Sequence, residues 1–137
     1  MKAVYPVIFT QTKTNVLVEV PDLEILTEGR DVAEAVEMAR DAIGITGISM
    51  QDHKEEIPHA TNIEEIDVNA GAFSSEGKSF VSLVDIDFDV YRRKVDMKTV
   101  RRNVTLPNWL NVAAEAAHIN VSKLLQDALM EKLGVSR

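Results

Sequence analysis

The chain has no cysteine, and its 137 residues include one tryptophan, four prolines and six glycines. Without cysteine there is no disulfide framework, no thiol nucleophile and no thiolate metal site. The sequence also lacks an apolar run long enough to span a membrane, and its first residues lack the apolar core of a signal peptide. No glycine-rich phosphate loop, nucleophile elbow or catalytic triad is visible. We therefore expect a cytoplasmic protein that avoids membranes, is not an enzyme and needs no cofactor or metal.

Charge is distributed unevenly along the chain, whose formal net charge is -7. Residues 1–95 hold 9 basic and 18 acidic residues, which gives -9, whereas residues 96–137 hold 6 and 4, which gives +2. We predict two domains with this boundary. An acidic body joined to a slightly basic tail indicates a basic partner for the first domain and a polyanion for the second.

The first domain opens with a pattern typical of a β-hairpin. Residues 4–10 and 16–20 are two β-branched runs separated by a short polar stretch. A third, short strand is expected around residues 24–27, after the turn that proline and aspartate favour.

From Asp31 onward the apolar spacing changes to that of a helix, and Asp31 with Glu34 matches the D-x-x-E form of a capping box. Residues 44–79 are interrupted by glycine and polar clusters, so they predict a fading helix and a loop. Residues 80–90 alternate as a strand. The first domain is thus expected to be an antiparallel sheet covered by a helix.

Three aspartates, Asp85, Asp87 and Asp89, would share one face of this last strand. Adjacent carboxylates can hold Mg²⁺, which would suit a metal-dependent nuclease. A ladder of acids on one strand is more often solvated, or faces a partner of opposite charge. We therefore expect no metal site, and we take these three residues as candidates for contact with a basic partner.

The tail begins with another alternating stretch, residues 99–106, which predicts a strand ending before Pro107. Arg101, Asn103 and Thr105 fall on one face, and the opposite face is largely apolar. Two amphipathic helices should follow, over residues 108–118 and from a cap at Ser122 to a stop at Gly134.

A strand and two helices in about forty residues bury too little apolar surface to fold alone. Two copies that pair their strands antiparallel would complete the sheet edges and bury both helix faces. We therefore predict a homodimer through the tail, with its core formed by Val104, Leu106, Leu110, Leu124, Leu125 and Leu129.

The order strand, LPNWL, helix, INVS, helix over residues 98–133 resembles the ribbon-helix-helix DNA-binding proteins. The resemblance implies that the paired strands enter the major groove and that Arg101, Asn103 and Thr105 read base edges. Their chemistry agrees, because Arg pairs with guanine, Asn with adenine, and Thr bonds a base or touches a thymine methyl. The alternative is that these residues form only the hydrated face of a dimerisation strand.

The same family anchors a DNA phosphate at the start of its second helix. In this sequence that position holds Ser122 and Lys123. Free N–H groups and the helix dipole favour an anion there.

The first domain has a resemblance of its own. YPVIFT, VEVPDL, the helix VAEAVEMARDAI and a later strand ending in DVYRRK, together spanning about residues 3–94, resemble the HicB antitoxins. The resemblance implies a partial ribonuclease-H-like fold, and a HicA-like toxin partner, a small basic protein that cleaves messenger RNA. Some family members carry a C-terminal ribbon-helix-helix domain.

The expected protein is thus a dimeric α+β antitoxin of a type II toxin-antitoxin system. It would block a HicA-like toxin in a heterotetramer or larger complex, and repress its own operon by binding operator DNA. Two alternatives stay open: a ribbon-helix-helix repressor that responds to a ligand or stands alone without a toxin, and the Mg²⁺-dependent nuclease.

Overall fold

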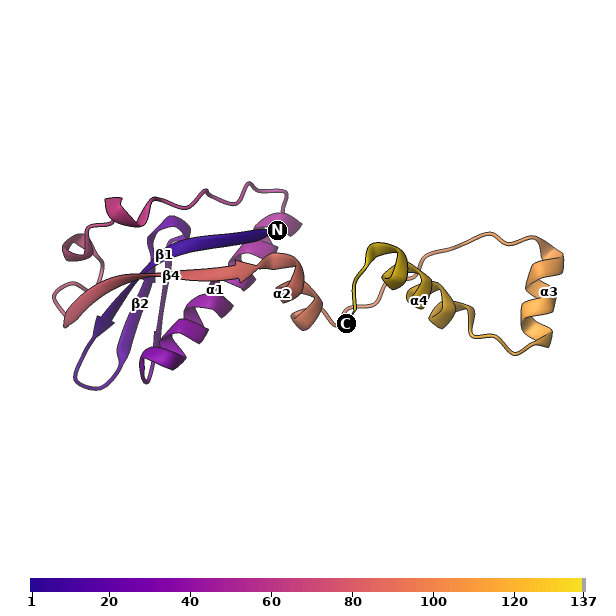
Figure 1. The fold of residues 1–137 in the computed structure, drawn as a ribbon, viewed down its shortest axis with the longest axis horizontal. Helices are drawn as coiled ribbons and strands as arrows, with labels where there is room; N and C mark the ends of the chain where they lie inside the picture. Colours follow the sequence, from indigo (N-terminus) through magenta and orange to yellow (C-terminus); the bar gives the residue numbers. More distant parts are fainter. Residues whose placement is uncertain (137) are drawn as a thin grey trace. The chain divides into compact units, whose positions relative to one another are not determined.

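The computed structural model describes residues 1–136 and divides the chain into two compact units, Met1–Asp96 and Met97–Arg137 (Figure 1). This division lies one residue from the predicted domain boundary. Each unit is described by itself below. No helix in the described part of the chain is both long and apolar enough to cross a bilayer.

The first unit is built on a four-stranded antiparallel sheet with strand order β3-β2-β1-β4. Its strands are β1 (Lys2–Gln11), β2 (Val16–Val20), β3 (Ile25–Gly29) and β4 (Lys78–Asp87). The hairpin of β1 and β2 is as predicted. β3 starts one residue later than expected and extends to Gly29, because Glu24, in a left-handed conformation at φ 54°, ends a 3-10 turn first.

Helix α1 (Val32–Asp52) starts where the sequence predicted, since the Asp31 carboxylate accepts a hydrogen bond of 2.8 Å from the Glu34 amide. The Glu34 carboxylate accepts from the backbone amide of Arg30 and not from that of Asp31. The helix then continues nine residues beyond Ile43, because two glycines on its buried side are sites where aromatic rings pack.

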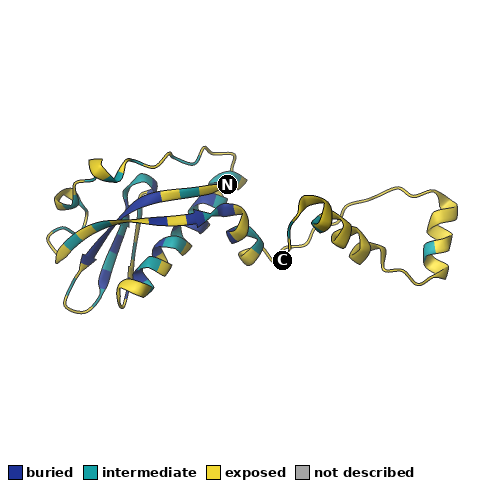
Figure 2. Ribbon diagram, in the orientation of Figure 1, coloured by how far each residue is buried: buried dark blue, intermediate teal, exposed yellow. Residues whose placement is uncertain are grey.

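The core of the first unit lies between α1 and one face of the sheet (Figure 2). Small residues on α1 let it lie close to the strands, and β-branched and aromatic side chains fill the space between. The fully buried members are Val7, Phe9, Val16, Val18, Val20, Ala35, Ala39, Ile43 and Phe88.

The opposite face of the sheet is crossed by the chain between α1 and β4, which contains the 3-10 turns η2 (Ile63–Glu65) and η3 (Val68–Ala70). Strand alternation places Ile8 and Glu19 on this face. The Glu19 carboxylate accepts from the Ala72 amide at 3.0 Å. The sequence therefore correctly indicated irregular structure here, but not that it covers the sheet.

The predicted strand over residues 80–90 is wrong at its end. β4 stops at Asp87, whose carboxylate accepts from the amides of Asp89 and Val90 at 3.1 and 3.3 Å and so caps helix α2 (Phe88–Val95). The alternating apolar pattern continues past the end of the strand, because Phe88 would be buried in a strand and is also buried as the first residue of α2.

The second unit contains helices α3 (Asn108–Ala116) and α4 (Val121–Leu133), close to the predicted positions. Gly134 ends α4 at φ 67°, as expected. In the turn between the helices the left-handed residue is His118 at φ 54°, whereas Asn120 is extended at φ -79°.

Candidate functional site

Residues 97–107 of the second unit form no helix or strand. The strand predicted over residues 99–106 is therefore absent from the single chain. A β-strand needs a neighbour for its N–H and C=O groups, and the expected neighbour was the same strand of a second copy. Arg101, Asn103 and Thr105 are exposed along this segment, and their role in reading bases stays a prediction.

The apolar faces of α3 and α4 have no core of their own, and neither helix contains a buried residue. The six residues predicted to form the dimer core are 37% to 58% exposed. They are Val104, Leu106, Leu110, Leu124, Leu125 and Leu129. Exposed apolar helix faces of this kind mark an interaction site, since soluble monomers rarely leave large apolar surface open.

Ser122 does not cap α4. The cap is Asn120, whose side-chain oxygen accepts from the Lys123 amide at 3.0 Å. Ser122 instead lies inside the first turn, where helix N–H groups still lack intrahelical acceptors. The Lys123 ammonium forms an exposed ion pair of 3.3 Å with Asp127, one turn further on. A phosphate at the start of α4 would thus compete with the Asp127 carboxylate for the Lys123 ammonium. Binding of a phosphate there stays a prediction.

Asp85 and Asp87 occupy alternate positions of β4, but Asp89 lies in α2, so the three aspartates do not share one strand face. Asp85 lies in β4 and pairs with Arg40 of α1 at 3.0 Å; this hydrogen bond holds the pKa of the Asp85 carboxyl below its usual range. Asp87 caps α2, and Asp89, in the first turn of α2, binds the α-amino group of Met1.

The ladder on which the nuclease hypothesis rested is therefore not formed. Within residues 1–136, no group of three or more His, Asp or Glu side chains is arranged to hold a metal ion. Contact of the three aspartates with a toxin stays a prediction, but it would involve a strand edge and a helix start and not one continuous acidic face.

Helix α2 is bound tightly to α1, a feature that the sequence analysis missed. A Cβ atom added at Gly44 would lie 2.7 Å from the Tyr91 ring, and one at Gly47 would lie 2.1 Å from the Phe88 ring. The Tyr91 hydroxyl donates to Asp41 at 2.6 Å, and burial, together with this bond, raises the pKa of Tyr91 strongly. Two glycines three residues apart, matched by two aromatic residues three apart, were the available signal.

Arg92 completes this attachment at the end of α1. Its guanidinium donates to the carbonyl of Ile48 at 3.3 Å and to the Gln51 side chain at 3.1 Å, and it pairs with Asp52 at 2.9 Å. A cation is favoured at a helix C-terminus, where carbonyl groups lack intrahelical donors. Helix α2, which ends one residue before the first unit does, is therefore packed against and hydrogen-bonded to α1.

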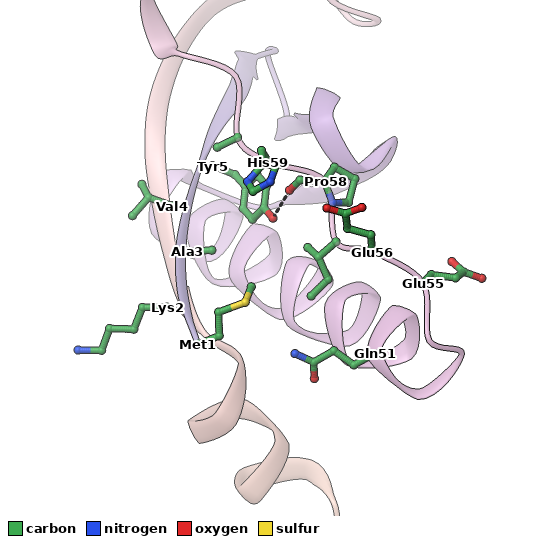
Figure 3. Close-up of a pocket in the computed structure, with 12 residues that line it drawn as sticks. Met1, Lys2, Ala3, Val4, Tyr5, Gln51, Glu55, Glu56, Pro58 and His59 are labelled. Carbon is green, nitrogen blue, oxygen red and sulfur yellow. Dashed lines mark hydrogen bonds between the residues drawn. The ribbon is translucent and has the colours of Figure 1, made fainter.

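An open hollow of about 590 Å³ lies beside the beginning of β1 (Figure 3). Residues 1–5 line one side of it, and residues 55–60, which follow α1, line the other. The Tyr5 hydroxyl crosses to the Pro58 carbonyl at 2.7 Å, and burial, assisted by Asp22, raises the pKa of Tyr5. The rim contributed by the second segment carries Glu55 and Glu56, which are both exposed.

The chain matches a known family over most of its length. The family is described as HicB-like antitoxin of bacterial toxin-antitoxin systems, and the match spans residues 5–129, which includes most of both units. The protein is therefore an antitoxin by class. More specifically, it belongs to the HicB-like antitoxin family.

Two solved structures are similar to this chain. One, a toxin-antitoxin complex from Streptococcus pneumoniae, has a TM-score of 0.62 at 24% identity and covers 96% of this chain and 99% of that chain. The other, the antitoxin HicB of Burkholderia pseudomallei, has a TM-score of 0.52 at 21% identity, with 96% and 97% covered. These likenesses support the mixed α and β fold. No curated protein matches the chain.

Proposed function

We propose that this antitoxin neutralises a small basic toxin of the HicA type through residues 1–96. We propose further that it binds operator DNA as a ribbon-helix-helix dimer through residues 97–137 and so represses the operon that encodes both proteins. The observation behind this proposal is the contrast between the units. The first has a closed core, whereas the second exposes the apolar faces of both its helices.

The DNA-binding part rests on the second unit. Its helices fit the two-helix order of the ribbon-helix-helix family, and a second copy would supply the missing strand and cover the apolar faces. Arg101, Asn103 and Thr105 lie in the segment that would form the ribbon, and all three side chains are exposed. They include the residue types that pair with guanine and adenine in the major groove.

The toxin-binding part rests on the first unit and on family membership. Residues 1–96 carry 9 basic and 19 acidic residues, a net charge of -10. A surface with this excess of negative charge attracts and orients a basic protein. The same excess disfavours DNA, so nucleic acid should bind to the second unit.

Co-expression with a small basic protein, where one is encoded beside this gene, tests the proposal. The expected result is a stable complex in which RNA cleavage by that protein is blocked, together with retardation of a DNA duplex containing the gene's own promoter. If the duplex is retarded but no neighbouring protein binds, the alternative of a repressor without a toxin is correct. If the duplex is not bound either, the DNA-binding part is wrong.

A further inference from the structure

The beginning of β1 has an open backbone edge. Pairing with β2 begins at Ile8, whereas pairing with β4 extends over the whole of β1, from Lys2 to Gln11. The first residues of β1 therefore have a strand neighbour on one side only. The hollow of Figure 3 lies along the other side.

Strand alternation shows which backbone groups face this open edge. The Met1 carbonyl accepts from the Phe88 amide at 3.0 Å, on the β4 side. In an antiparallel pair, bonded and non-bonded residues alternate, so the N–H and C=O groups of Lys2 and Val4 point away from β4. Pro6, which has no N–H to donate, falls in the same phase.

The chain leaves this edge unprotected. No hydrogen bond within residues 1–136 joins the backbone of Lys2 or Val4 to residues 55–60. The outer edge of β4 differs, because Arg40 Nε donates to the Asp85 carbonyl at 3.0 Å there. Unpaired strand edges readily accept another strand, and proteins usually cover them.

The surroundings of the edge indicate what kind of strand fits. Val4 is 46% exposed, and Ile57 and Pro58 supply half-buried apolar surface across the hollow. Glu55 and Glu56 lie on the far rim, and neither belongs to an ion pair within residues 1–136.

Besides the α-amino group of Met1, Lys2 carries the only cationic side chain among the residues that line the hollow. Lys2 forms no ion pair with Glu55 or Glu56 within residues 1–136. Its side chain, with that of Val4, points away from the side where Tyr5 meets Pro58 (Figure 3). An extended segment that carries lysine or arginine beside small apolar residues therefore complements both the edge and the acidic rim.

We infer that an extended basic segment of the toxin adds as a strand to the open edge of β1 at residues 2–4, with a lysine or arginine side chain beside Glu55 and Glu56. This inference rests on the proposed function, since it names the place on the first unit that the toxin occupies. Main-chain hydrogen bonds supply the affinity in such strand addition, and the flanking side chains supply the specificity.

Amide hydrogen exchange on the full chain, alone and in complex with a small basic toxin found beside its gene, tests the inference without any substitution. The Val4 amide should exchange much more slowly in the complex. Protection of Val4 without that protein, increasing with antitoxin concentration, would instead show that a second copy of this chain occupies the edge, and would overturn the inference.

Two matched pairs of variants test the edge and the rim separately. Val4→Pro removes the N–H that faces the hollow and leaves the β4 ladder intact, whereas Val4→Thr keeps both that N–H and the branched shape. Glu55→Lys with Glu56→Lys reverses the charge of the rim, whereas Glu64→Lys with Glu65→Lys makes the same change of charge in η2, away from the hollow. Thermal unfolding checks that each variant is folded.

The first member of each pair should weaken toxin binding by about tenfold or more, which corresponds to about 1.4 kcal/mol, and its control by much less. Full affinity in both Val4→Pro and the Glu55 and Glu56 double variant would overturn the inference and leave the antitoxin function standing. Equal loss in the two charge-reversal variants would show steering by overall charge and not a groove. Failure of the unaltered chain to bind the basic protein would overturn both proposals.

Discussion

The two units of this antitoxin differ in where their apolar side chains lie. In the first, a sheet and α1 enclose a core with fully buried valine, isoleucine and phenylalanine side chains. In the second, two helices of similar amphipathic character contain no buried residue. The difference shows that amphipathic elements fold alone only when the chain also supplies the opposing surface. The second unit has no sheet to supply it, so we expect a second copy to do so.

The largest effect should follow from Leu125→Asp. Burial of leucine contributes about 1.5–3 kcal/mol per copy, and a carboxylate in an apolar interface is more costly still. If the second unit folds only as the proposed dimer, dimerisation and retardation of the promoter duplex should be lost together, because folding and association would then be one equilibrium. Analytical ultracentrifugation and a gel-shift assay measure the two losses.

Met38→Asp is the matched control. Met38 is 38% exposed in the single chain and Leu125 is 37% exposed, but Met38 lies on α1, whose core-facing side is already buried. Its replacement should leave both the dimer and DNA binding intact. A folded monomer of the Leu125→Asp variant that still binds DNA would remove the distinction between the units.

In the first unit, the corresponding disruption is Gly47→Ala. The added Cβ would lie 2.1 Å from the Phe88 ring, and overpacking of a closed core typically costs about 1–3 kcal/mol. Ile45→Ala, on the exposed side of the same helix, should cost much less. Unfolding in urea, followed by the circular dichroism of Tyr5 and Tyr91, measures the loss.

The same experiment separates the units, because both tyrosines lie in the first unit and the single tryptophan, Trp109, lies in α3. Tryptophan fluorescence should therefore show an unchanged transition for the second unit in Gly47→Ala. A shift of both transitions by the same amount would mean that the units unfold as one.

Gly47 also shows why the sequence analysis ended α1 too early. Glycine lowers helix propensity, so by local preference Gly44 and Gly47 predict a fading helix. The structure uses them for close approach of α2, and tertiary packing outweighs the local preference. The partner rings, Phe88 and Tyr91, lie more than forty residues away in the sequence, and local periodicity cannot reveal such a match.

The start of α1, the hairpin and both helices of the second unit were predictable, because caps and apolar spacing are local signals. The aspartate ladder was wrong for the opposite reason. Alternation continued from β4 into Phe88, and only the capping bonds of Asp87 show that the strand has already ended. The hollow beside β1 was not predictable at all, since it depends on β2 being shorter than β1.

A prediction confined to the second unit concerns Arg101. If the exposed segment becomes the DNA-reading ribbon, Arg101→Ala should cost about 1–3 kcal/mol of operator affinity and relax the preference at one base pair. Arg102→Ala, on the opposite face of the predicted strand, should leave base preference unchanged. Fluorescence anisotropy with promoter duplexes and with random duplexes measures both effects. Equal loss on both kinds of DNA would show that Arg101 contacts phosphate only.

The smallest effects should come from the helix caps. Each unit has a helix whose N-terminus is capped by a side chain. The Asp31 side chain accepts from the Glu34 amide in α1, and the Asn120 side chain accepts from the Lys123 amide in α4. Replacement of either by alanine removes the acceptor for one orphan N–H and should cost about 1 kcal/mol of unfolding free energy.

The difference lies in what each loss affects. Asp31→Ala should lower the tyrosine-detected transition at every protein concentration, because the core of the first unit lies within one chain. Asn120→Ala should lower the tryptophan-detected transition, and the midpoint should recover as protein concentration increases, since mass action favours a folded dimer. A concentration-independent midpoint for Asn120→Ala would show that the second unit folds without a second copy, because dimerisation is what links its stability to concentration.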